Sequence, residues 1–278
     1  MICGYRRRKM NHKVVEMAMV RAIRSVAQGI FQVDLRCPQV ADLVLPGQFV
    51  TVEPGIASAT CRRPFTVYSR TDEGIRLVFQ DVGPNTHAYS QWQAGQKVEI
   101  LGPCGQGISI DTARKCFLML AGGCGLASMH LPTWEIGEQT SARIIVGCGF
   151  RRRAQVFGQA DFQKIITDPN DLHVVTQEED NKTAVDLLRV ILNSESELPP
   201  PDKIQIITCG RNQMMQQVAA IAKQAGISCL VFIEQVMGCG GLGACCSCAV
   251  PLKAGGFAKL CEDGPVFLAE EVNWDELV

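Results

Sequence analysis

Residues 116–127 of this 278-residue chain read CFLMLAGGCGLA, six apolar residues followed by a glycine-rich turn. A short apolar run predicts a strand buried on both faces of a parallel sheet. Glycines directly after such a strand let the backbone approach a pyrophosphate, which the N–H groups and dipole of the following helix attract. Gly122, Gly123 and Gly125 are therefore candidate cofactor-binding residues. Ser128 stands where the full dinucleotide fingerprint has its third glycine, so a sharp turn without a ligand stays open as the alternative.

The pattern of that strand recurs further along the chain. Three more apolar runs follow, at Arg143–Val146, His173–Thr176 and Ile204–Thr208. The stretch Gln213–Ala225 has a helical composition, with Asn212 as its predicted N-cap and Gly226 at C′. Apolar strands alternating with helices predict an α/β layer built on a parallel sheet. Cys209 and Gly210 follow the last run, where small residues let a nicotinamide approach a flavin, and they are further cofactor-binding candidates.

The chain before Asp111 has a different pattern, of short strands separated by turns. Runs rich in Val, Ile, Phe, Thr and Tyr occur at Val20–Leu35, Phe49–Val52, Phe65–Tyr68, Ile75–Phe79 and Val98–Ile100. Pro-Gly, Gly-Pro and Asp-Glu-Gly turn signals lie between or beside these runs. Many short strands at this spacing predict a small closed antiparallel β-barrel.

Two segments of the barrel region carry groups suited to a flavin nucleotide. Arg62 and Arg63 precede a strand with the sequence PFTVYS, and an arginine at that point can pair a pyrophosphate with two hydrogen bonds. The later segment Gly83-Pro84-Asn85-Thr86 offers backbone N–H groups and a hydroxyl to a phosphate. Arginine pairs are usually solvated and Gly-Pro pairs are usually plain turns. The order of the two segments along one barrel is what favours a flavin site.

The C-terminal segment concentrates cysteines. The chain has 14 of them, and five lie between Cys239 and Cys261. Four follow the spacing Cys239-x5-Cys245-x2-Cys248-x12-Cys261. This is close to the plant-type 2Fe–2S pattern, C-x4-C-x2-C with a distant fourth cysteine. Three glycines in the first spacer suit a loop bent around a cluster, whose sulfurs accept hydrogen bonds from backbone N–H groups.

The first spacer has five residues instead of four, so the loop carries an insertion that its two adjacent glycines can absorb as a bulge. Cys246 is the substitute candidate for a ligand, but only Cys245 preserves the two-residue spacing to Cys248. A four-cysteine zinc site is the alternative, because zinc also favours short paired spacings. Zinc sites of this kind usually have two C-x2-C halves, and only one is present here, which favours iron–sulfur.

Composition excludes several classes of protein. The chain is 47% hydrophobic and its formal net charge is −1, which argues against disorder and against broad binding to nucleic acids or membrane surfaces. Its longest apolar stretch, Cys116–Pro132, is interrupted by glycines and is too short to span a bilayer. The first thirteen residues are basic and have no apolar region of a secretion signal. Clustered cysteines favour metal or redox chemistry in a reducing compartment, so we expect a cytoplasmic protein.

The order of these motifs resembles that of a known family. The segments RRPFTVYS, GPCGQG, AGGCGLAS, CGRNQMM, the cysteine loop and CEDGPVF resemble the electron-transfer subunits of class 1B dihydroorotate dehydrogenases, in the ferredoxin reductase-like superfamily. The resemblance covers essentially the whole chain after residue 13. It implies a multidomain β plus α/β fold. After a flexible arm at 1–13 come an FAD-binding β-barrel domain at 14–111, an NAD-binding α/β domain at 112–228 and a 2Fe–2S cluster domain at 229–278.

The resemblance also assigns residues by matched motif. It implies FAD contacts at Arg63, Pro64, Phe65, Thr66, Asn85 and Thr86. It implies cluster ligands at Cys239, Cys245, Cys248 and Cys261. The chain departs from the family pattern in its five-residue spacer, in its arginine-rich start and in Thr66, where serine is common.

The resemblance implies a partner as well, an FMN-containing catalytic subunit that oxidises dihydroorotate to orotate in pyrimidine (UMP) biosynthesis, in a heterotetramer of two plus two. Electrons would enter at the cluster, collect on FAD and leave to NAD⁺, because a flavin exchanges both single electrons and hydride. No residue of this chain would then be catalytic. Two alternatives stay open. One is an NAD(P)H–ferredoxin or sulfur reductase subunit, which the arginines at 151–153 favour because they suit a 2′-phosphate. The other is a non-redox zinc-binding interaction module.

Overall fold

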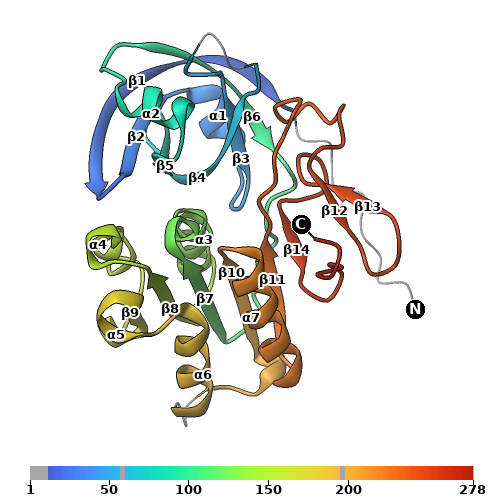
Figure 1. The fold of residues 1–278 in the computed structure, drawn as a ribbon. Helices are drawn as coiled ribbons and strands as arrows, with labels where there is room; N and C mark the ends of the chain where they lie inside the picture. The colour runs from blue at the N-terminus through green and yellow to red at the C-terminus, as the bar shows by residue number, and fades with distance from the viewer. Residues whose placement is uncertain (1–11, 57–59, 195–197, 278) are drawn as a thin grey trace.

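The computed structural model describes residues 12–56, 60–194 and 198–277 (Figure 1). A β-barrel forms one end of the molecule, an α/β layer forms the other, and the C-terminal segment lies alongside both. The predicted fold class, β plus α/β, is therefore confirmed. Residues 1–11 of the predicted arm lie outside the described residues.

The barrel is closed by six antiparallel strands in the order β1-β2-β5-β4-β3-β6. They are β1 (Val14–Ala27), β2 (Ile30–Arg36), β3 (Phe49–Val52), β4 (Arg63–Thr71), β5 (Gly74–Gln80) and β6 (Lys97–Cys104). Two short helices, α1 (Pro38–Leu43) and α2 (Pro84–Ser90), lie in the connections. Val20, Leu77 and Ile100 are among the buried side chains that fill the barrel. The run predicted at Val20–Leu35 is a hairpin of β1 and β2.

The α/β layer is a six-stranded sheet in the order β14-β11-β10-β7-β8-β9, parallel except for β14. Its strands are β7 (Cys116–Gly122), β8 (Arg143–Phe150), β9 (Leu172–Thr176), β10 (Ile204–Cys209), β11 (Ser228–Phe232) and β14 (Val266–Leu268). The α-helices are α3 (His130–Gln139), α4 (Gln159–Phe162), α5 (Gln177–Asp180), α6 (Ala184–Ser194) and α7 (Asn212–Gln224). Short 3-10 helices are η1 (Gly123–Met129), η2 (Arg153–Gln155), η3 (Pro169–Asp171) and η4 (Pro201–Lys203).

The structure differs from the sequence expectations in two of its strands and in one helix cap. The sequence does not predict β11 or β14, although β14 brings the end of the chain back to the edge of the sheet. The expected domain boundary after residue 228 falls at the first residue of β11, and the domain limits stay a prediction. Helix α7 begins at Asn212 with Arg211 as its N-cap, so the capping role predicted for Asn212 is wrong. Gly226 has a φ of +69°, as its predicted place beyond the helix end requires.

The C-terminal segment is attached through a shared core. After β11 the chain forms the cysteine loop and then a small antiparallel pair, β12 (Ala249–Pro251) and β13 (Phe257–Lys259). Val250 and Leu260 are buried in the same cluster as Ile206 of the sheet and Phe49 of the barrel. Burial of apolar surface therefore holds this segment against both other parts. Among the helices of the described ranges, none combines the length and the hydrophobicity that crossing a bilayer requires.

A second contact joins the barrel to the sheet at Tyr68 of β4. Its ring stacks on His130 at the start of α3, with 4.2 Å between the ring centroids, and its hydroxyl donates to Asp161 of α4 at 2.9 Å. The imidazole Nδ1 donates to the Tyr68 carbonyl at 3.0 Å. Burial and the neighbouring Asp161 carboxylate raise the pKa of Tyr68, so the phenol stays protonated and keeps donating.

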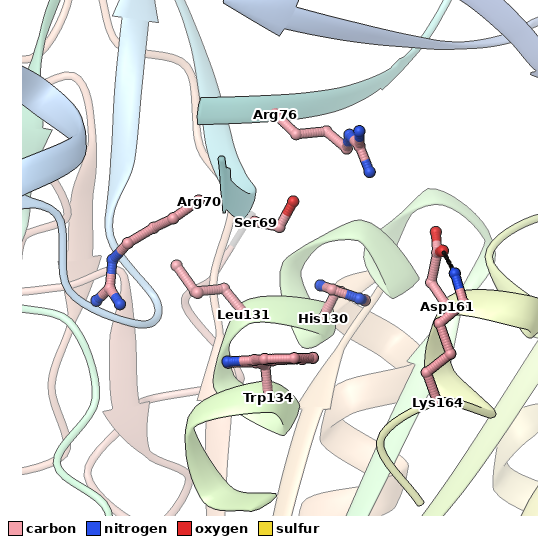
Figure 2. Close-up of a pocket in the computed structure, with 8 residues that line it drawn as sticks. All are labelled: Ser69, Arg70, Arg76, His130, Leu131, Trp134, Asp161 and Lys164. Atoms are coloured by element: carbon pink, nitrogen blue, oxygen red, sulfur yellow. Dashed lines mark hydrogen bonds and ion pairs between the residues drawn. The ribbon is translucent and has the colours of Figure 1, made fainter. Parts of the chain in front are cut away.

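A cavity of about 310 Å³ opens beside this contact (Figure 2). Its lining comes from Ser69, Arg70, Arg76, His130, Leu131, Trp134, Asp161 and Lys164. The three cations, Arg70, Arg76 and Lys164, are each paired with a carboxylate at 2.6 to 3.5 Å. Little unpaired charge is left to attract a ligand, so we interpret this cavity as a packing gap in the contact between the barrel and the sheet.

This contact predicts an acid sensitivity. Burial lowers the pKa of His130, so the native state keeps the ring neutral while the unfolded state is protonated near pH 6.5. The contribution of neutral His130 to the free energy of unfolding is fully present above about pH 6.5 and is lost as the pH falls below that value. His130→Asn keeps an N–H donor near the Tyr68 carbonyl and cannot titrate. We expect its urea midpoint to fall less between about pH 7.5 and 5.5 than that of the parent. An equal fall in both proteins would contradict this assignment.

Candidate functional site

The thiols of Cys248 and Cys261 lie together although thirteen positions separate them in the chain. Their sulfur atoms are 3.6 Å apart, and both side chains are buried. Two thiolates on one tetrahedral metal atom with bonds of about 2.3 Å lie about 3.8 Å apart. The spacing between Cys248 and Cys261 therefore fits two ligands of the same metal atom.

Cys239 and Cys245 form a second pair at the other side of the loop. The backbone N–H of Cys239 donates to the Cys245 sulfur at 3.2 Å, and that of Ser247 donates to it at 3.5 Å. Burial alone would raise the pKa of Cys239, but hydrogen bonds from the N–H groups of Cys245, Ala244 and Leu242 and from the Cys245 thiol lower it to about 6. The donors expected of a cluster-binding loop are therefore present.

The three glycines of this loop have conformations that other residues rarely adopt. Gly240, Gly241 and Gly243 have φ values of +64°, +91° and +81°. A Cβ at Gly241 would lie 3.1 Å from Thr51 Cγ2 and 3.2 Å from Cys104 Sγ, and one at Gly243 would overlap the Glu262 carboxylate. The insertion in the first spacer is thus accommodated by residues without side chains. The donor set and the loop both fit a thiolate-bound cluster.

Hydrogen bonds to its carbonyl groups hold this loop against the barrel. The Thr51 hydroxyl on β3 donates to the Gly240 carbonyl at 2.8 Å, and Lys13 Nζ donates to the Gly241 carbonyl at 2.7 Å. Lys13, which the sequence assigns to the flexible arm, is therefore anchored on the cysteine loop. Neither Thr51 nor Lys13 carries a sequence signal for this role, because each contacts residues about two hundred positions away.

The predicted flavin residues Arg63 to Thr66 are the first four residues of β4. Arg63 donates to the backbone carbonyls of Cys61 and Arg62, at 2.8 and 3.4 Å. Pro64, Phe65 and Thr66 follow it on the strand and are all partly exposed. The Phe65 ring packs on Phe79 and Tyr89, with centroids 5.6 and 5.9 Å apart. Arg63 and Thr66 keep polar groups at the barrel surface, as a dinucleotide contact requires.

Asn85 and Thr86 are buried, and their side chains have local roles. The Asn85 Oδ1 accepts from the Gly55 N–H at 2.9 Å. The Thr86 hydroxyl accepts from the N–H groups of Val82 and Gly83 at 2.9 and 3.0 Å. These bonds shape the turn that leads into α2. Any contact that Asn85 and Thr86 make with a cofactor would therefore depend chiefly on their backbone groups.

The predicted nucleotide residues of the sheet meet at the carboxyl ends of β7 and β10. These strands are parallel neighbours, and Cys209 pairs with Ala121. A Cβ at Gly125 would lie 2.6 Å from the Cys209 carbonyl oxygen, so a glycine is needed there for close packing. Gly123 has a φ of +55° and open space where a side chain would be. Gly122 and Gly210 also lie side by side, since a Cβ at Gly210 would lie 3.3 Å from the Gly122 nitrogen.

Two residues that the sequence analysis did not select connect these groups. The Ser128 hydroxyl, on η1, donates to the Thr66 hydroxyl on β4 at 3.1 Å and so joins the nucleotide loop to the flavin strand. The Cys209 thiol contacts the Glu234 carboxylate at 3.9 Å, and surrounding protein raises the pKa of Glu234. Glu234 lies just beyond β11, at the carboxyl end of a parallel strand, where ligands gather. The sequence analysis missed it because it did not predict that strand.

The cysteine segment matches a known family. Residues 234–273 fit the model of the iron–sulfur cluster binding domain of dihydroorotate dehydrogenase B. The electron transfer subunit of dihydroorotate dehydrogenase B (NAD⁺) from Listeria innocua is 30% identical over 255 residues, which cover 89% of this chain and 94% of that protein. The chain belongs to the family of these electron transfer subunits. The subunit from Desulforamulus reducens is 28% identical and covers 93% of this chain and 98% of its own length.

Solved structures agree with this family. A structure of an NADH-dependent reduced ferredoxin–NADP oxidoreductase has a TM-score of 0.81 at 25% identity and covers 94% of this chain and 91% of its own. A cytochrome P450 reductase from Amycolatopsis has a TM-score of 0.62 at 18% identity and covers 78% of this chain and 68% of its own, which shows a shared fold. Both structures therefore share most of the fold of this chain.

The cysteine loop of this family member predicts a difference between two glycine substitutions. Gly241→Ala and Gly255→Ala both place a side chain at a positive φ, +91° and +87°, which costs about 1–2 kcal/mol of strain. Only the Gly241 side chain would also press on Thr51 and Cys104, since Gly255 has open space. We expect iron content after anaerobic reconstitution to fall several-fold in Gly241→Ala and to stay near the parent value in Gly255→Ala. Equal iron in both variants would contradict the steric role of Gly241.

Proposed function

We propose that this chain carries electrons between an FMN-containing dihydroorotate dehydrogenase catalytic subunit and NAD⁺, in the synthesis of pyrimidine nucleotides. A 2Fe–2S cluster would exchange single electrons, NAD⁺ would take a hydride, and FAD would convert one kind of transfer into the other. The observation that carries the proposal is that one barrel holds both loops: β3 is hydrogen-bonded to the cysteine loop, and the arginine-bearing strand β4 is hydrogen-bonded to the segment that follows β7. Oxidation of dihydroorotate itself would take place on the partner.

Cys239, Cys245, Cys248 and Cys261 are the proposed cluster ligands. A single zinc ion needs its four ligands around one point. The sulfurs lie instead as two pairs, which suits a cluster of two metal atoms and supports iron–sulfur over the zinc alternative.

The nucleotides are proposed to bind between the barrel and the sheet. Arg63, Pro64, Phe65 and Thr66, with the turn at Asn85 and Thr86, would hold FAD. Gly122, Gly123, Gly125, Cys209 and Gly210 would receive NAD. Ser128, hydrogen-bonded to Thr66, would fix the distance between the two nucleotides, and Glu234 beside Cys209 would keep a carboxyl of raised pKa next to the nicotinamide.

The partner is proposed to dock on the cysteine segment. Val236, Leu242 and Phe257 in this segment are 63 to 76% exposed. Exposed large apolar side chains in one segment support a protein interface there, and a partner bound to this segment would bring a second flavin close to the cluster. We propose a heterotetramer of two chains of each kind. Among the described residues, no two cysteines are joined by a disulfide, which supports a cytoplasmic location.

If dihydroorotate is oxidised only on the partner, the proposal predicts which reductant can reduce the flavin of this chain alone. The purified chain, reconstituted with FAD, iron and sulfide, should have its flavin bleached by NADH and left unchanged by dihydroorotate. Adding the FMN-containing subunit should make dihydroorotate bleach the flavin and reduce NAD⁺. Absorbance of the flavin in the visible range follows both reactions. Bleaching by dihydroorotate without the partner, or a chain that binds no flavin, would contradict the proposal.

A reductase specific for NADPH is the second candidate. Arg151, Arg152 and Arg153 are exposed beyond β8, where a 2′-phosphate would be recognised. The same bleaching assay separates the two candidates. Flavin reduction at least tenfold faster with NADPH than with NADH would favour this second function, and the reverse preference would favour the first.

The loop geometry also predicts which of two adjacent cysteines is a ligand. Both cysteines are exposed, but the Cys245 sulfur accepts two backbone hydrogen bonds, and Cys246 has a backbone φ of +55°. Cys245→Ser should abolish the visible absorbance of the 2Fe–2S cluster and the EPR signal of its reduced form. Cys246→Ser should keep both. If Cys246→Ser loses the cluster and Cys245→Ser keeps it, the insertion shifts the ligand by one residue and the assignment is wrong.

A further inference from the structure

Three cationic side chains contact the glycines of the cysteine loop. Lys13 Nζ donates to the Gly241 carbonyl at 2.7 Å, and Lys259 Nζ donates to the Gly243 carbonyl at 2.9 Å. The stem of Arg62 lies against the glycine that precedes Gly241. Positive charge is therefore brought to the same loop from the start of β1, from the entry to β4 and from β13.

The three cations differ in how far neighbouring acids compensate them. Arg62 forms an ion pair with Glu99, and Lys259 forms one with Glu262 at 3.0 Å. In the part of the chain that the structure describes, no carboxylate pairs with Lys13. Lys13 is also only partly exposed. Its charge is therefore the least compensated of the three at this loop.

The charge of Lys13 lies close to the proposed cluster. Its Nζ is 2.7 Å from the carbonyl oxygen of Gly241, two residues after the proposed ligand Cys239. A Cβ at Gly241 would lie 3.2 Å from the Cys104 sulfur, so this part of the loop packs closely against β6. A positive charge fixed at this place favours added negative charge in the site.

We propose that Lys13 is a positioning residue that raises the reduction potential of the 2Fe–2S cluster. On reduction a cluster accepts one electron and becomes one unit more negative. A fixed positive charge nearby therefore stabilises the reduced form more than the oxidised form. The inference rests on the proposed function, because it requires the cysteines to hold a cluster. It gives the residue that ends the basic arm a role in setting the direction of electron flow.

Three variants separate the charge of Lys13 from its hydrogen bond. Lys13→Gln keeps an N–H donor for the Gly241 carbonyl and removes the charge, whereas Lys13→Arg keeps both. Lys97→Gln is the matched control, since Lys97 is an exposed lysine at the far end of β6. The rise along a strand puts it about 23 Å from Cys104. The full chain is reconstituted anaerobically, iron and sulfide are assayed, and the midpoint potential of the cluster is measured by EPR-monitored titration.

We expect the midpoint of Lys13→Gln to become more negative, by about 59 mV if the ratio of reduced to oxidised cluster at a fixed potential changes tenfold. Lys13→Arg and Lys97→Gln should stay near the parent midpoint. A Lys13→Gln protein with full iron and the parent midpoint overturns the inference. So does loss of iron in both Lys13 variants, because it would make the residue structural. A parent chain without iron and sulfide refutes the proposed function instead, so the two failures are distinct.

Discussion

The contact between the cysteine loop and the barrel is the constraint on which the candidate site depends. The loop turns through three positive-φ glycines, and its carbonyl groups are held by the Thr51 hydroxyl and by two lysines. Side chains at these positions would collide with the barrel or with Glu262. Only a loop without side chains can lie this close to β3 and β6. That closeness is what would put a cluster beside a flavin held on β4.

The remaining geometry follows from shared burial. One hydrophobic cluster contains barrel, sheet and C-terminal residues, and a second joins the barrel to β7 and β8. These cores hold the cysteine loop and the glycine loop of β7 against the same barrel. The return of β14 to the edge of the sheet closes the C-terminal segment and accompanies the approach of Cys261 to Cys248. The single hydrogen bond between Ser128 and Thr66 then lies where the two proposed nucleotides would meet.

Much of this arrangement can be predicted from local sequence, and the failures have physical reasons. The apolar runs that begin at Cys116, Arg143 and Ile204 are strands, because a run of that length buried on both faces has few other stable conformations. Strand β14 was missed because three residues carry no periodic signal and gain their stability from pairing with β11. Ser128 was interpreted as a missing glycine, whereas its hydroxyl has a partner 62 positions away.

The sequence by itself determined the kinds of chemistry available: four cysteines at cluster spacing, an arginine before a barrel strand and a glycine loop after a buried strand. These are short-range patterns, and each is complete within about twenty-five residues. Tertiary structure alone decided that Glu234 meets Cys209 and that Lys13 reaches the cysteine loop. The reason is that burial and hydrogen bonding stabilise these contacts only in the folded chain, where residues far apart in sequence lie side by side.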